Sequence, residues 1–152
     1  MRTRSLTAIG VALLLGFVAG CADHKTVDVS TTIGHSLKDA YAILGYPGEL
    51  PVDRYRLLLT PLEDVPGKTG PTNTRDDPAT LVVLATCIID SSEPYITSPP
   101  DPDGPSAIAL GVAPIELATP TVRERAKRGA FQDDLTGSKN CREDGSLTAT
   151  YS

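Results

Sequence analysis

The sequence predicts an α+β fold: a small mixed or antiparallel sheet of three or four strands, one or two short helices, and long proline-rich loops. Three observations favour this class. Apolar, β-branched runs of strand length recur along the chain, and two short segments carry helix caps and helical apolar spacing. The chain also has 13 prolines and 13 glycines, which favour turns and loops.

The first elements after residue 25 are predicted to be a strand and a helix. Residues 26–30 alternate in polarity, as in a short strand. Ser36 is placed to cap a helix that ends at Leu44, with Asp39 in the position of the capping-box acid. Gly45 then supplies the left-handed stop. The apolar residues of this helix recur at helical spacing and form one face: Leu37, Ala40, Tyr41 and Leu44.

Three further strands are expected, separated by two long loops. Residues 52–60 alternate, whereas residues 80–90 form a continuous apolar run, which predicts a central strand buried on both faces. Residues 107–113 are expected to form a third core strand. The loops, residues 61–79 and 91–106, contain four and five prolines, and such long loops are either functional or mobile.

A second helix is predicted from Thr121, which is placed to cap it, to Arg128, with Gly129 closing it. Glu124 and Arg128 are four residues apart in the order that favours an ion pair. From Gln132 onward the tail is polar, and we expect it to be held only through Cys141. The narrow apolar side of the helix would consist of Val122, Ala126 and Ala130.

The N-terminus is typical of an export signal. Arg2 and Arg4 precede the apolar run of residues 8–18, which is too short to span a bilayer. The stretch Val18-Ala19-Gly20-Cys21 resembles the bacterial lipobox. That resemblance implies a lipid on the Cys21 thiol and cleavage in front of it, the alternative being an ordinary secretory signal. We therefore expect a signal peptide at 1–20, a lipidated leader at 21–30 and a single extracytoplasmic domain at 31–152.

The charge of the chain excludes some partners. Removal of residues 1–20 takes away two arginines and no acids, leaving 12 basic and 19 acidic residues and a net charge of −7. Nucleic acids are bound by neutralising phosphates with Lys and Arg, so a nucleic-acid partner is not expected. Attachment to the membrane would come from lipid on Cys21 rather than from surface charge.

The two remaining cysteines, Cys87 and Cys141, are expected to form a disulfide, because paired thiols persist outside the cytoplasm. The bond would join the polar tail to the most apolar strand of the chain. The alternative is two free thiols.

Residues 27–45 show a second, limited resemblance. Gly34, Ser36-Leu37, Asp39-Ala40 and Leu44 resemble the opening of PASTA domains, in which a short strand leads into a helix that ends near glycine. The resemblance implies binding of cell-wall peptide or glycan, but it carries no site residues that could be transferred. The rest of the chain departs from the PASTA pattern in its length and in its two proline-rich loops.

The motifs of common enzyme classes do not occur in the sequence. It has no Gly-x-Ser-x-Gly elbow, no Ser-x-x-Lys and no phosphate-binding loop. We expect no catalytic residue, cofactor or metal. The acidic candidates for a hydrolase or a calcium site are Asp76, Asp77, Asp101 and Asp103, which are also typical turn residues. His35 is expected to be a solvated residue beside the helix cap.

The basic cluster stands out in an acidic chain, and it either contacts a partner or forms a solvated helix face. It consists of Arg123, Arg125, Lys127 and Arg128. The leading functional prediction is a membrane-anchored, non-enzymatic binding module that contacts the cell wall or an envelope protein. One alternative is a phage- or prophage-encoded lipoprotein that blocks superinfection, and a second is an envelope hydrolase.

Overall fold

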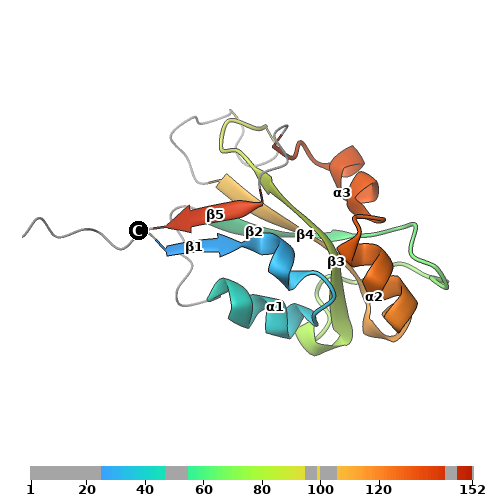
Figure 1. Cartoon of the computed structure of the whole chain (residues 1–152). Coiled ribbons are helices and arrows are strands. Elements are labelled where there is room, and N and C mark those ends of the chain that lie inside the picture. Colours follow the sequence, from blue (N-terminus) through green and yellow to red (C-terminus); the bar gives the residue numbers. More distant parts are fainter. Residues whose placement is uncertain (1–24, 47–54, 95–98, 100–105, 143–146, 152) are drawn as a thin grey trace, which may run out of the picture.

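A computed structural model describes residues 25–46, 55–94, 99, 106–142 and 147–151. Within these ranges the chain forms five strands, three α-helices and three short 3-10 helices, which confirms the predicted α+β class (Figure 1). In chain order the elements are β1 (Lys25–Asp28), η1 (Val29–Thr32), α1 (Leu37–Leu44), β2 (Tyr55–Pro61), η2 (Pro78–Thr80), β3 (Leu81–Ile89), β4 (Ser106–Pro114), η3 (Ile115–Leu117), α2 (Pro120–Lys127), α3 (Gln132–Ser138) and β5 (Thr148–Tyr151).

The main sheet is mixed and has the order β2–β4–β3. Strand β2 runs parallel to β4, with Tyr55 opposite Ser106, and β3 runs antiparallel to it. The prediction of a strand within residues 80–90 that is buried on both faces is confirmed for β3, whose residues are all buried, whereas Thr80 and Asp90 at its two ends are exposed. The prediction that this strand is the central one of the sheet is wrong, since β4 lies between β2 and β3. Short apolar runs predict burial but not strand order, because an edge strand covered by other segments has the same composition.

The outer edge of β3 is covered by chain segments in place of another full strand. At its first half, Val83 exchanges backbone hydrogen bonds with the chain before α1: its N–H donates to His35 at 3.0 Å, and its carbonyl accepts from Gly34 at 2.7 Å. At its second half, the Gln132 side chain and the Arg142 backbone donate to β3 carbonyls. Covered edges of this kind protect a sheet from pairing with other chains.

Two core clusters occupy the two faces of the main sheet. On one face, β3 and β4 pack against α2 and α3 through Val122, Ala126, Phe131 and Leu135. On the other face they pack against α1, η1 and the β1–β5 pair through residues that include Leu37, Ala40, Leu44, Val29 and Ala149. Figure 1 shows α2 and α3 together on one side, and α1 with β1 and β5 on the other. The sheet is therefore the middle layer.

A β-bulge between Val83 and Ala85 changes the alternation along β3. Before the bulge, the even-numbered residues pack toward α2 and α3; after it, the odd-numbered residues do. A bulge adds one residue to one strand of a pair, so every following side chain changes face. As a result Cys87 belongs to the cluster that contains α2 and α3.

Helix α1 has the predicted limits. The Ser36 hydroxyl accepts from the Asp39 N–H at 3.1 Å and donates to the Asp39 carboxylate at 2.7 Å. Gly45 closes the helix with φ of 72°, in the left-handed region that glycine adopts without strain. The preceding strand, β1, ends at Asp28, two residues before the predicted end, because Val29–Thr32 forms a 3-10 helix.

Helix α2 begins earlier than predicted. Its cap is Thr119, whose hydroxyl accepts from the Val122 N–H at 3.2 Å, and Pro120 occupies the first turn. The predicted cap, Thr121, therefore lies inside the helix. Proline fits the first helical position because its missing N–H would have no partner there. Val122 and Ala126 are buried as predicted, but Ala130 is exposed.

The polar tail is more closely integrated than predicted. It contains α3, whose Leu135 is fully buried, and it is preceded by Phe131, of which only 2% is exposed. Its last strand, β5, pairs antiparallel with β1, with Val27 opposite Ala149. The expectation that Cys141 alone holds the tail is therefore wrong. The low average hydrophobicity of the segment concealed a few buried apolar positions.

The first long loop is also partly internal. Leu62 and Val65 are buried in the cluster that contains α2 and α3. The Asp134 carboxylate accepts from the N–H groups of Glu63, at 2.8 Å, and Asp64, at 3.3 Å. The carboxylate thus joins this loop to the first turn of α3. Much of the second loop, including Asp101 and Asp103, lies outside the described residues.

Candidate functional site

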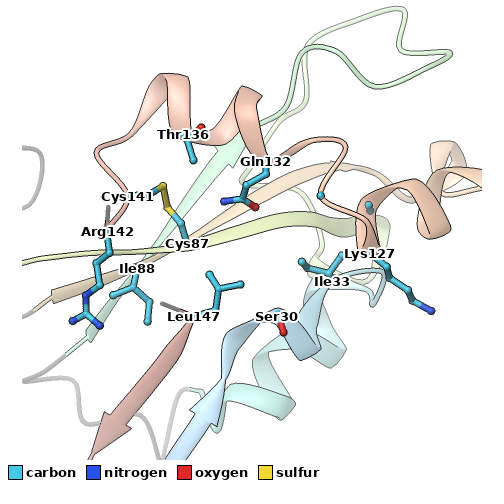
Figure 2. Close-up of a pocket in the computed structure, with 12 residues that line it drawn as sticks. Ser30, Ile33, Cys87, Ile88, Lys127, Gln132, Thr136, Cys141, Arg142 and Leu147 are labelled. Atoms are coloured by element: carbon cyan, nitrogen blue, oxygen red, sulfur yellow. A yellow bond between two sulfur atoms is a disulfide. The ribbon is translucent and has the colours of Figure 1, made fainter. Parts of the chain in front are cut away.

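A groove of about 300 Å³ lies between η1 and the pair of helices α2 and α3 (Figure 2). The edge of β3 forms its floor at Cys87 and Ile88, and the tail closes one end. Its lining combines aliphatic side chains with a few polar ones. The lining residues are Ser30, Ile33, Cys87, Ile88, Ala126, Lys127, Gly129, Gln132, Thr136, Cys141, Arg142 and Leu147.

The disulfide between Cys87 and Cys141 lies in the wall of this groove, as Figure 2 shows, and the predicted pairing is confirmed. Cys87 is buried in the strand, whereas Cys141 is partly exposed. Next to the bond, the Arg142 N–H donates to the Ile88 carbonyl at 2.9 Å. Gln132 fixes α3 to the same strand through its side-chain N–H, which donates to the Thr86 carbonyl at 3.0 Å. These contacts give the groove a cross-linked wall.

Lys127 and Arg142 lie at opposite ends of the groove, with Ile33, Ile88 and Leu147 between them in Figure 2. The Lys127 ammonium is 3.3 Å from a Glu124 carboxylate oxygen, an exposed pair one helical turn apart. The Arg142 Nε donates to Asp90 at 2.6 Å. A groove with an aliphatic centre and a cation at each end can bind a ligand that is apolar in the middle and negatively charged at both ends.

The structure divides the predicted basic cluster. Lys127 lines the groove, whereas the three arginines make local contacts. The Arg123 Nε donates to the Ala118 carbonyl at 3.0 Å, and the Arg125 guanidinium lies 5.5 Å from the centroid of the Phe131 ring. The Arg128 Nε donates to the Glu124 backbone carbonyl at 3.3 Å. The predicted Glu124–Arg128 ion pair is thus replaced by Glu124–Lys127.

The acidic candidates that the structure describes have local structural contacts. Asp77 caps η2 by accepting from the Ala79 N–H at 2.9 Å. The Asp76 carboxylate accepts from the Asn73 side-chain amide at 2.7 Å. Among the described residues, no group of three His, Cys, Asp or Glu side chains is placed to hold a metal ion.

Most residues of the groove carry no signal in the sequence. Ile33, Gln132, Arg142 and Leu147 come from segments without a recognisable motif, and only the tertiary fold brings them together. One signal was available: Arg142 follows the cysteine whose pairing was predicted, so it had to lie near Cys87. Cys21, the predicted lipid attachment residue, lies outside the described residues.

A second hollow, of about 460 Å³, adjoins the groove and shares Thr136, Cys141 and Arg142 with it. Its remaining lining residues are polar: Glu93, Lys139 and Asn140. The Asn140 side-chain amide donates to the Glu93 carboxylate at 2.7 Å. The disulfide and Arg142 thus separate an apolar surface from a polar one.

An aromatic pair lies at the end of α1. The rings of Tyr41 and Tyr46 are 5.1 Å apart between centroids and tilted by 48°. Burial raises the pKa of the Tyr41 hydroxyl, and the neighbouring Tyr46 raises it further. Tyr46 is exposed at 43%, in contrast to the buried apolar residues of α1.

Comparisons with known proteins identify no relative: no family model, no curated protein and no solved structure matches this chain. In the described part of the chain, no helix combines the length and apolarity needed to cross a membrane.

Proposed function

We propose that this chain is a lipid-tethered, extracytoplasmic binding module of the cell envelope, and that the groove beside the disulfide is its ligand site. The observation that carries the proposal is the groove itself, in which an aliphatic floor lies between Lys127 and Arg142. Pockets of this composition, with few polar groups in defined positions, are typical of ligand sites.

Two features support the location outside the cytoplasm. The stretch Val18-Ala19-Gly20-Cys21 resembles a lipobox and follows a basic start and a short apolar run. The disulfide between Cys87 and Cys141 is of a kind that persists in oxidising compartments and is rare in the reducing cytosol. These two features depend on different residues and lead to the same location.

Metabolic labelling with a palmitate analogue tests the tether. The full chain should take up label and sediment with membranes, and Cys21→Ser should lose both properties. The double variant Cys87→Ser/Cys141→Ser is the matched control, because it removes the other two thiols and should keep the label per amount of protein. Label retained by Cys21→Ser would disprove lipid attachment at this residue.

Site-specific cross-linking in intact cells tests the groove. A photoreactive residue at Thr136, an exposed position in the lining, should give a defined adduct with cell-wall material or an envelope protein. The same residue at Arg75, an exposed position outside the groove, is the control. Equal adducts at both positions, or none at Thr136, would argue against the groove as the binding site.

A further inference from the structure

The charged side chains that line the groove have one sign. Among the described lining residues these are Lys127 and Arg142, both cations. The complete chain has the opposite excess, with 19 acidic and 14 basic residues. Lys127 and Arg142 each pair with an acid that is not among the described lining residues, Glu124 and Asp90, so the groove itself presents cationic donors, which favour a negatively charged ligand over a cationic one.

Both cations can receive a carboxylate from a ligand. The Lys127 side chain is 59% exposed, and its ion pair with Glu124 is a surface pair of the kind that contributes little to stability. A ligand carboxylate can therefore bind the Lys127 ammonium beside Glu124 or in its place. Asp90 positions Arg142 through Nε, and a guanidinium carries five N–H donors that suit a carboxylate. The backbone bond from Arg142 to Ile88 further fixes the direction from which this side chain leaves the tail.

The part of the groove between the two cations determines which chemical group of the ligand fits between its negative charges. Its partly exposed branched aliphatic side chains are Ile33 and Leu147, which lie beside the disulfide, whereas Ile88 beneath them is fully buried. Water on such a surface is displaced favourably by an apolar side chain. A free phosphate or small carboxylate would leave a volume of about 300 Å³ largely unfilled.

We infer that the ligand of the groove is an acidic segment of a partner protein, bound in extended form with one large aliphatic side chain on the floor and a carboxylate at each end. This inference rests on the proposed function of the groove as a binding site. It assigns Lys127 and Arg142 to the two carboxylates, and Ile33 and Leu147 to the aliphatic side chain.

A peptide array probed with the full-length chain in detergent tests the assignment. The array carries pentapeptides with Leu or Ala at the centre and Glu, Gln or Lys on both sides. We expect retention of the Leu peptides flanked by Glu, with affinity at least about tenfold above that for the Gln and Ala counterparts, since a charged hydrogen bond or a buried aliphatic side chain each supplies about that factor. Equal retention of Gln-flanked or Lys-flanked peptides would overturn the inference.

Charge reversal provides the second arm. Lys127→Glu/Arg142→Glu should transfer the preference from Glu-flanked to Lys-flanked peptides, a gain that a misfolded protein would not show. The matched control is Lys38→Glu/Arg75→Glu, which changes the net charge equally at exposed positions outside the groove and should leave the preference unchanged. Unchanged preference in the groove variant would overturn the inference.

Binding of cell-wall material gives a different result from binding of an acidic protein segment. If peptidoglycan fragments bind in competition with the peptides, the groove is a binding site but its ligand class is not the inferred one. If the Thr136 adduct forms in cells and survives charge reversal at Lys127 and Arg142, the proposed binding function stands and the acidic-segment inference fails. If neither peptides nor peptidoglycan fragments bind and no adduct forms, both proposals fail.

Discussion

The backbone N–H of Arg142 donates to the carbonyl oxygen of Ile88 at 2.9 Å, which extends the edge of β3 with a piece of the C-terminal tail. Cys87 and Cys141, which form the disulfide, are the residues directly before Ile88 and Arg142 in the sequence. A covalent bond and a hydrogen bond thus fix the same short stretch of tail against the strand. Since this stretch also closes one end of the groove, the stability of the tail and the shape of the groove depend on the same contacts.

Reduction of the disulfide should lower the free energy of unfolding. Cys87 and Cys141 are 54 residues apart in sequence, and the loop-closure entropy of such a cross-link corresponds to about 4 kcal/mol. Urea unfolding of the full chain in detergent, followed by circular dichroism with and without reductant, measures the change. The double variant Cys87→Ser/Cys141→Ser is the control, because its unfolding midpoint should not respond to reductant. An unchanged midpoint in the wild-type protein would contradict the prediction.

The observed cap of α2 is Thr119, whereas the sequence predicted Thr121. Thr119→Ala should destabilise the protein by about 1 kcal/mol, because it leaves the Val122 N–H without its side-chain acceptor. Thr121→Ala is the matched comparison: it removes the same atoms from an exposed position inside the helix and should change stability by no more than about 0.5 kcal/mol. Chemical denaturation of both variants decides between the two caps, and a larger loss for Thr121→Ala would restore the sequence-based assignment.

The choice between Thr119 and Thr121 could not be made from the sequence pattern alone. The composition of α2 predicts a helix, but both Thr119 and Thr121 can serve as a cap. The capping-box spacing from Thr121 to Glu124 favoured the wrong one. Pro120 does not decide between the two caps from the sequence, because proline fits the first turn of a helix as well as the extended residue before one; in the structure it occupies the first turn. At α1 a single serine precedes the apolar face, and there the prediction is confirmed.

Long-range features were predictable only in part. The burial of β3 follows from nine consecutive apolar or small residues, and the disulfide follows from the cysteine count. The bulge between Val83 and Ala85 has no local signal, yet it determines which face Cys87 occupies. Strict alternation from Val83 onward would place Cys87 on the face of α1, away from the helices that contact the tail. The groove could not be predicted because its position depends on that bulge and on the covered edge of β3.

A glycine in the central strand should be intolerant of a side chain. A Cβ at Gly111 would lie 2.8 Å from the Leu62 Cδ2 and 3.1 Å from the Ala85 Cβ, closer than side chains pack. Gly111→Ala should therefore cost about 1–3 kcal/mol through forced repacking of the core. Gly70→Ala is the control, because no atom beyond its own residue and its two chain neighbours lies within 4 Å of its Cβ position. Urea midpoints of the two variants measure the difference, and equal midpoints would show that Leu62 moves aside without cost.

Leu135 tests whether the tail belongs to the core. Its side chain is fully buried in the cluster that contains Phe131, so Leu135→Ala should lose about 2–5 kcal/mol through lost burial and the cavity left behind. The next residue, Thr136, is exposed, and Thr136→Ala should change stability by no more than about 0.5 kcal/mol. Both variants keep the disulfide, so the difference between their urea midpoints reports the packing of α3 alone. A Leu135→Ala protein as stable as the wild type would mean that Cys141 holds a tail that contributes little to the core, as the polar sequence of this segment suggested.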